Sequence, residues 1–186
     1  MKQGVGARAG DVALLLKAAT FAAHKHRDQR RKDVKARPYI NHPLAVAQAL
    51  CDKGDVSDPI ILAAALLHDT IEDTETTYDE LRGQFGARIA DIVSEVTDTK
   101  FLGKQSRKRL QLSKAVRARA AAQQVKIADK LCNLRDILAS PPAKWSERRK
   151  HEYFDWAKAV VEQVRGANPK LAERFDAVWE AGMGQR

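Results

Sequence analysis

The residues best suited to chemistry follow an apolar run in the first half of the chain. His68 and Asp69 come directly after Ala63–Leu67, and Glu72 and Asp73 lie three and four positions beyond Asp69. On a continuing helix these positions share a face with Asp69. Histidine and aspartate are metal ligands, and the two further carboxylates are suited to orienting water or moving its proton. The spacing points to hydrolysis at a metal ion, unless the run merely ends a helix in a solvated acidic turn.

Two further residues with ligand chemistry stand elsewhere in the chain. His42 precedes Pro43 at an expected helix start, and Asp129 lies within an apolar helical pattern, where an unpaired carboxylate is costly. Each also has an ordinary explanation, His42 as a helix cap and Asp129 as the partner of a nearby basic residue. Together with His68 and Asp69 they come from three separate expected helices. Two imidazoles and two carboxylates suit a divalent ion such as Mn²⁺, Fe²⁺ or Zn²⁺, with positions left for water and a phosphate oxygen.

Apolar positions repeat at helical spacing through most of the chain, and no sustained strand-type alternation or hairpin signal interrupts them. We predict an all-α protein, a single compact bundle of about eight to ten helices forming one domain over residues 1–186, with its core from about 11 to 182. The expected N-caps are Asp11, Asn41 or His42, Asp58, and a threonine at 76 or 77. The expected helices are 11–28, 41–54, 58 into the 63–73 stretch, 76–85, 89–98, 123–139, 146–164 and 169–179.

Composition narrows the class of protein. The 186 residues are 44% hydrophobic and 31% charged, and no apolar run approaches the roughly 20 residues that cross a bilayer. There is no convincing export signal, and Cys51 and Cys132 are expected as buried thiols, so we predict a cytoplasmic protein with no membrane partner. The net charge of +9 attracts anions, and the excess falls in Thr99–Ala128, which contains no acidic residue.

The order His42, His68–Asp69, Asp129 resembles the HD superfamily of metal-dependent phosphohydrolases. Longer strings resemble the hydrolase domain of RelA/SpoT-type proteins, and most of all the stand-alone small alarmone hydrolases such as the metazoan SpoT homologue. The resemblance spans about residues 12 to 180. The strings that carry it are Arg31–Lys32, Pro38–Pro43, Leu66–Thr74, Phe85–Gly86 and Lys126–Arg135.

The resemblance implies hydrolysis of guanosine tetra- or pentaphosphate, (p)ppGpp, at the ribose 3′ position. The products would be pyrophosphate and GDP or GTP. It also implies one Mn²⁺ per chain, with Fe²⁺ or Zn²⁺ as possible substitutes, held by the four candidate ligands. Glu72 and Asp73 would position and activate the attacking water.

The same resemblance implies which residues bind the nucleotide. Asn133, one turn after Asp129, would contact the sugar or the adjoining phosphate. Arg31 would stack on the purine, and Lys32 would line the base or a phosphate. The positions that match those around the 5′ phosphates and ribose are Lys104, Arg149 and Tyr153. Each also has an ordinary explanation as a solvated charge or, for Tyr153, as a core aromatic.

Two other functions remain open from the sequence. A phosphatase acting on NADPH or another phosphorylated nucleotide would keep the same site and change the substrate. A basic nucleic-acid-binding module would use the charge of residues 99–128, but it would not need six imidazole and carboxylate positions. Nucleic acid is therefore not the expected partner. We expect no synthetase or regulatory domain in the chain, and the oligomeric state and any regulator stay open.

Overall fold

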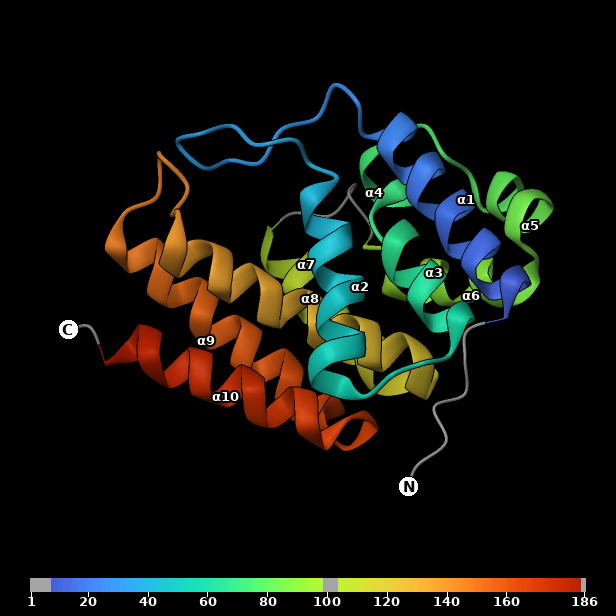
Figure 1. Ribbon diagram of the computed structural model, residues 1–186. Helices are drawn as coiled ribbons and strands as arrows, with labels where there is room; N and C mark the ends of the chain where they lie inside the picture. The colour runs from blue at the N-terminus through green and yellow to red at the C-terminus, as the bar shows by residue number, and fades with distance from the viewer. Residues whose placement is uncertain (1–7, 99–103, 185–186) are drawn as a thin grey trace.

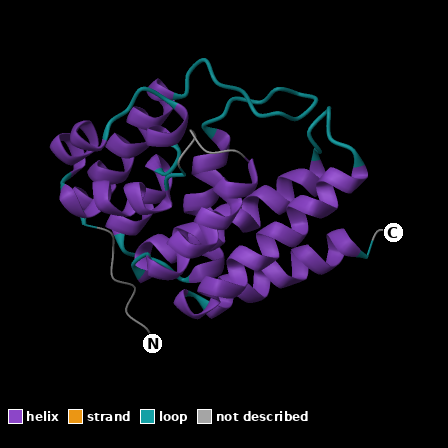
Figure 2. Ribbon diagram, turned by 180° about the vertical axis from the view of Figure 1, so that it is seen from behind, coloured by secondary structure: helices purple, strands orange, loops and turns teal. Residues whose placement is uncertain are grey.

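The computed structural model describes residues 8–98 and 104–184 and, within these ranges, all side chains except those of 104–109. In the described ranges the helices are joined by loops and turns, and the β-type pairing is limited to two isolated antiparallel bridges, Arg30–Pro38 and Asp33–Pro142. The expected all-α fold is therefore confirmed (Figures 1 and 2). The helices are α1 (Ala9–Lys25), α2 (Asn41–Gly54), α3 (Pro59–Leu67), α4 (Thr70–Asp73), α5 (Tyr78–Phe85), α6 (Ala87–Val96), α7 (Lys104–Arg117), α8 (Ala120–Ala139), α9 (Glu147–Val164), the 3-10 helix η1 (Arg165–Ala167) and α10 (Pro169–Met183).

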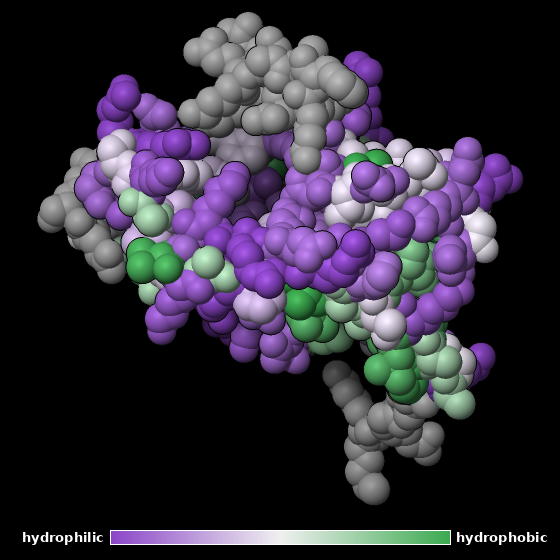
Figure 3. Space-filling view, turned by 90° about the horizontal axis from the view of Figure 1, so that it is seen from above, coloured by the Kyte–Doolittle hydropathy of each residue, from purple (hydrophilic) through white to green (hydrophobic). Residues whose placement is uncertain are grey.

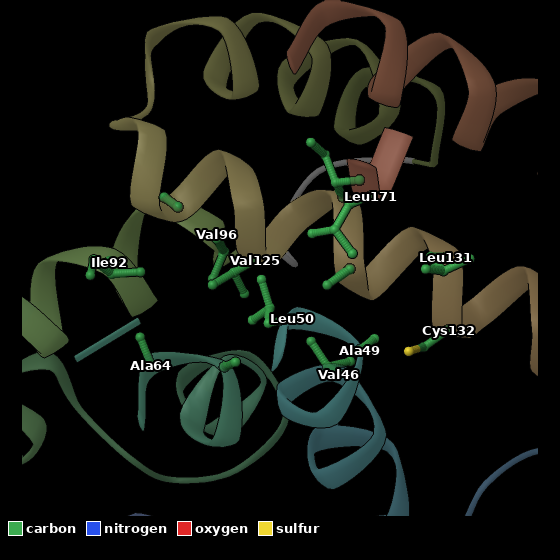
Figure 4. Packing of buried hydrophobic residues seen from close by; sticks show 14 of the residues in the cluster. Val46, Ala49, Leu50, Ala64, Ile92, Val96, Val125, Leu131, Cys132 and Leu171 are labelled. Carbon is green, nitrogen blue, oxygen red and sulfur yellow. The ribbon is translucent and has the colours of Figure 1, made fainter. Parts of the chain in front are cut away.

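Helix α8 runs through the middle of the bundle and contacts α2, α3, α6, α7, α9 and α10 (Figure 1). Its apolar residues extend around much of its circumference, as expected for a helix that is covered on several sides. Figure 4 shows Val125 and Leu131 of α8 gathered with Leu50 of α2, Val96 of α6 and Leu171 of α10, all of them buried. Asp129 therefore lies on a helix that other helices cover on several sides.

Helix α3 is the second buried helix, since every residue from Leu62 to Leu67 is buried and it packs against α1, α2, α6 and α8. Its start was predicted correctly: the Asp58 carboxylate accepts a hydrogen bond from the Ile60 N–H at 2.8 Å, and Pro59 fills the first turn. The cap of α5 is also confirmed, because Thr77 Oγ1 accepts from the Glu80 N–H at 3.1 Å.

The predicted cap of α2 is wrong. The helix begins at Asn41 with Ile40 as its N-cap, and neither Asn41 nor His42 caps it. Backbone carbonyls in the preceding turn take over this role, because the Asn41 N–H donates to Pro38 O at 3.3 Å and the His42 N–H donates to Tyr39 O at 2.9 Å. The His42 side chain is thereby left free for the site.

Three other predictions about helices need correction. Helix α1 begins at Ala9 with Arg8 as its N-cap, and Asp11 lies in its first turn instead of capping it. The central helix does not continue past Asp69: α3 ends at Leu67, and the short α4 begins at Thr70, whose Oγ1 donates to Leu67 O at 2.7 Å. Helix α7 was not predicted, because its lysine- and arginine-rich sequence lacks a clear apolar stripe. No helix in the described part of the chain combines the length and hydrophobicity that a bilayer crossing requires.

A buried asparagine joins three helices and provides a test of this packing. Asn168 Oδ1 accepts from the Leu171 N–H at 3.1 Å and caps α10, while Nδ2 donates to Gly54 O at 2.9 Å and to Gln124 Oε1 at 3.1 Å. We expect Asn168→Ala to lower the free energy of unfolding by about 2–3 kcal/mol, since a cap is lost and a buried carbonyl loses its donor. Urea unfolding measures this loss. Thr77→Ala, which removes an exposed cap, should lower the free energy of unfolding by only about 1 kcal/mol. Equal losses in both variants would show that Asn168 acts only as a cap and does not join the three helices.

Candidate active site

A cavity of about 780 Å³ opens between α2, α4, α8, α9 and the loops that precede α2 and α9. Figure 3, seen from the side of these loops, shows a largely hydrophilic face that is hollowed near its centre. The predicted site residues whose side chains the structure describes all line the cavity: Arg31, Lys32, His42, His68, Asp69, Glu72, Asp73, Asp129, Asn133, Arg149 and Tyr153. Lys104 begins α7, and its side chain lies outside the described part of the structure.

The four predicted metal ligands meet at one end of this cavity. His42 Nε2 lies 3.1 Å from Asp129 Oδ1 and 3.8 Å from Asp69 Oδ2. His68 Nε2 lies 3.0 Å from Asp69 Oδ2 and 3.8 Å from Asp129 Oδ1. Nitrogen and oxygen atoms thus alternate around a single point. The ligand atoms of His42, His68 and Asp69 all lie within 4.8 Å of one another, a spacing that could hold a metal ion.

The orientation of His68 fits a metal ligand. Its Nδ1 lies 2.8 Å from Ala65 O, and a carbonyl oxygen only accepts, so Nδ1 carries a proton. Its Nε2 is buried and faces Asp69 without the geometry of a hydrogen bond. A buried nitrogen directed at a carboxylate without a hydrogen bond is a suitable donor atom for a cation shared between the two groups.

Charge at this point is balanced in the metal-free molecule. Burial alone would lower the pKa of His68, but the Asp69 carboxylate outweighs it and raises that pKa to about 9. Burial outweighs the opposing effect of Asp129 at His42 and lowers its pKa. The pKa of Asp69 is lowered despite burial, chiefly by His68, and that of Asp129 is lowered by the charge of Lys130 and by hydrogen bonding to His42. Both carboxylates are therefore ionised at neutral pH, and His68 carries the compensating proton.

Further side chains hold the two ligand carboxylates. The Tyr39 O–H donates to Asp69 Oδ2 at 2.6 Å, and burial with this carboxylate nearby raises the pKa of Tyr39, so it stays a donor. Lys130 Nζ donates to Asp129 Oδ2 at 2.7 Å, and Asn133 Nδ2 donates to Asp129 Oδ1 at 2.6 Å. Such contacts orient ligands and tune their basicity.

Glu72 and Asp73 lie on α4, beside the ligand cluster, in different surroundings. The Asp98 N–H donates to Glu72 Oε2 at 3.1 Å, and burial together with the carboxylates of Asp98 and Asp69 raises the pKa of Glu72 to about 7. Asp73 Oδ2 accepts from Gln29 Nε2 at 3.0 Å. A carboxyl that exchanges its proton near neutral pH, next to a fixed carboxylate, is the arrangement that general acid–base chemistry needs.

The predicted nucleotide-binding residues lie along the cavity away from α4. Arg31 Nη2 donates to Asp136 Oδ2 at 2.7 Å and to Asn133 Oδ1 at 3.1 Å, and its guanidinium lies 5.6 Å from the Tyr39 ring centroid. Lys32 is exposed at the cavity rim.

Aromatic residues accompany the other two predicted contacts. The Arg149 guanidinium lies 4.6 Å from the Trp145 ring centroid. Tyr153 lies between Trp145 and Trp156, at 5.5 and 5.2 Å from their centroids. Burial raises the pKa of Tyr153 to about 12, so its hydroxyl is a neutral donor in the cavity wall.

Several cavity residues were not singled out from the sequence. Among them are Gln29, Tyr39, Asp98, Asp136, Trp145 and Trp156, while Lys126 and Lys130 were considered only as ordinary ion-pair partners of Asp129. Lys130 follows Asp129 directly and Tyr39 lies within the Pro38–Pro43 string, so position within these motifs was an available signal for both. Asp98 and Gln29 carried no such signal, because their role depends on contacts between segments far apart in sequence.

Comparison with known proteins identifies the family to which this chain belongs. The family model described as HD domain matches residues 18–155, and the chain belongs to the HD-domain family. An HD domain implies a divalent metal, which agrees with the cluster of His42, His68 and Asp69.

Within that class the similarity extends over nearly the whole chain. The chain is 52% identical over 166 residues to guanosine-3′,5′-bis(diphosphate) 3′-pyrophosphohydrolase MESH1 of Xenopus tropicalis, covering 89% of this chain and 93% of that protein. It is 52% identical over 163 residues to the human protein of the same name, covering 88% and 91%. A solved structure of a metazoan ortholog of SpoT that hydrolyses ppGpp aligns with a TM-score of 0.88 at 41% identity, covering 91% of this chain and 95% of that one. The resemblance noted in the sequence is confirmed.

The raised pKa of Glu72 predicts a pH-dependent stability of the metal-free protein. Between the ordinary value of 4.5 and about 7 the unfolded chain has lost a proton that the folded protein keeps, so stability falls as pH rises through this window. Glu72→Gln has no proton to lose at this position. We therefore expect the free energy of unfolding of the variant, relative to that of the wild type, to rise by about 1–3 kcal/mol across this pH window. Urea unfolding from pH 4.5 to 8 with a chelator measures this difference, with exposed Glu75→Gln as the control. Parallel curves for wild type and Glu72→Gln would show that Glu72 titrates normally.

Proposed function

We propose that the protein is a metal-dependent hydrolase that removes the 3′ pyrophosphate of (p)ppGpp, giving pyrophosphate and GDP or GTP. The observation that carries the proposal is the convergence of His42, His68, Asp69 and Asp129 beside Glu72 and Asp73 in one cavity. The alignments cover more than nine tenths of each of these relatives, and the names of the relatives support this substrate.

We assign the four ligand positions to one divalent cation, with Mn²⁺ as the proposed metal and Fe²⁺ or Zn²⁺ as substitutes. Imidazole and carboxylate ligands together suit these ions. When bound, such a cation would lower the pKa of water and polarise a phosphoryl oxygen. The donor set also fits on charge, because the two ionised carboxylates offset the charge of a divalent ion once His68 has lost its proton.

The chain's own carboxylates account for proton movement. Glu72, with a pKa of about 7, accepts the proton of the attacking water as that oxygen bonds to the phosphorus attached to the ribose 3′ oxygen. The bond between this phosphorus and the 3′ oxygen breaks, and the proton leaves with the nucleotide oxygen. Asp73, held by Gln29, orients the water.

The basic and aromatic residues account for recognition of a polyanionic nucleotide. Lys32 and Arg149 reach the cavity from its two loop-side walls, and Trp145 and Tyr153 offer a flat face and a hydroxyl. Arg31 can exchange its ion pair with Asp136 for contacts to the purine or a phosphate. Lys104 is proposed here on the family pattern alone.

We further propose that this one hydrolase domain acts in the cytoplasm. Cys51 and Cys132 are both free thiols, as is usual in a reducing compartment. Cys132 is buried as expected, but the expectation that Cys51 is buried is wrong, because it lies exposed on α2.

Product analysis tests the proposed reaction. With Mn²⁺, the wild-type protein should release pyrophosphate and GDP from ppGpp, and it should do so with a higher kcat/KM than it shows for NADPH or for deoxynucleoside monophosphates. Ion-exchange chromatography of the products separates these reactions. Turnover of NADPH without release of pyrophosphate from ppGpp would reject the proposal in favour of a different nucleotide substrate.

Replacement of Asp129 tests the fourth ligand. We expect Asp129→Ala to abolish turnover and to reduce bound manganese from about one per chain to a trace. The substitution removes one of the four proposed ligands, and it leaves His42 and Lys130 without the carboxylate that they both contact. Elemental analysis of the purified variant measures the metal. The exposed Asp155→Ala on α9 is the matched control and should keep both properties. Retained manganese-dependent activity in Asp129→Ala would remove this residue from the site.

A further inference from the structure

A buried histidine outside the ligand cluster is connected to the acidic pair. His26 follows α1, is 2% exposed, and has its Nδ1 2.6 Å from Gln29 Oε1. Gln29 Nε2 in turn donates to Asp73 Oδ2 at 3.0 Å. The three side chains form a chain of hydrogen bonds from the end of α1 to α4.

The direction of these hydrogen bonds follows from their terminal group. An ionised carboxylate only accepts, so the atom of Gln29 that faces Asp73 has to be its amide nitrogen. The carbonyl oxygen of the same amide then faces His26, which has to donate from a protonated Nδ1. The charge of Asp73 thereby determines both the orientation of the Gln29 amide and the tautomer of His26.

The backbone holds this chain of side chains in place. The Gln29 N–H donates to His26 O at 3.0 Å, and Gln29 O accepts from the Tyr39 N–H at 3.1 Å. The His26 ring lies against that of Tyr39 with centroids 4.9 Å apart, and the Tyr39 hydroxyl donates to Asp69. His26 therefore supports one residue of the ligand cluster through Tyr39 and one acid through Gln29.

We propose that Gln29 is a positioning residue for Asp73 in the hydrolysis described above, and that His26 sets the direction of the Gln29 amide. The inference rests on the proposed function, because it assigns Asp73 the task of orienting water. Without the amide donor the Asp73 carboxylate loses the hydrogen bond that holds Oδ2, while the basic and aromatic residues proposed to bind the nucleotide keep their places in the cavity. The effect falls on kcat and leaves KM nearly constant.

Turnover by matched variants tests the positioning role. We expect Gln29→Leu, of similar size but without a donor, to lower kcat about 10- to 100-fold with KM and manganese content unchanged. His26→Phe should have a similar but smaller effect. His26→Asn should recover part of the loss, because an asparagine amide nitrogen can replace Nδ1 as a donor. Gln163→Leu, on the exposed side of α9, is the control for loss of a glutamine.

Nitrogen NMR of the metal-free protein gives a second result that does not depend on turnover. The ¹⁵N shifts of His26 should show the Nδ1–H tautomer in the wild type, and this preference should weaken in Gln29→Leu. An Nε2–H tautomer in the wild type would overturn the inference. If the wild type is active and kcat of Gln29→Leu is less than twofold lower, the inference is overturned as well. A wild type that shows the Nδ1–H tautomer but releases no pyrophosphate from ppGpp would instead refute the proposed function and, with it, the role given to Gln29.

Discussion

Two half-buried carboxylates, Asp69 and Asp129, depend on the positive charge beside them. An unpaired buried charge costs several kcal/mol, and removing one partner of a buried pair typically costs about 3–5 kcal/mol. Here His68 and Lys130 supply the compensation, and both have pKa values raised by the carboxylates they face. The same balance makes the cluster receptive to a cation, because binding exchanges the proton on His68 for a larger positive charge. The rest of the bundle keeps these four groups together.

The helices position this cluster through interruptions as much as through regular structure. The break between α3 and α4 turns His68 and Asp69 toward α8, and α4 then presents Glu72 and Asp73 to the same cavity. The turn before α2 satisfies the first backbone N–H groups of that helix, so His42 is available as a ligand candidate. Asp129 comes from the central helix α8, where its carboxylate is tolerated because Lys130, Asn133 and His42 contact it. Each interruption costs some helical hydrogen bonding, and each releases a side chain for chemistry.

The all-α fold could be predicted from the sequence because its helix signals are strong, and local motifs together with the family they resemble indicated many of the residues that line the cavity. Asp58 and Thr77 were recognisable as caps from their neighbours alone. Three kinds of feature lay beyond such reasoning. Backbone carbonyls replaced the expected cap of α2, and α7 formed without an apolar stripe. The contacts of Asp98 with Glu72 and of Gln29 with Asp73 join positions that only the folded chain brings together.

We propose that residues from three parts of the chain share one cation. Crystals grown with Mn²⁺, measured on both sides of the manganese absorption edge, test it most directly. We expect one anomalous peak, within coordinating distance of His42 Nε2, His68 Nε2 and carboxylate oxygens of Asp69 and Asp129, in the cavity that Glu72 and Asp73 line. A peak that leaves out Asp129, or manganese bound only elsewhere on the surface, would contradict the account.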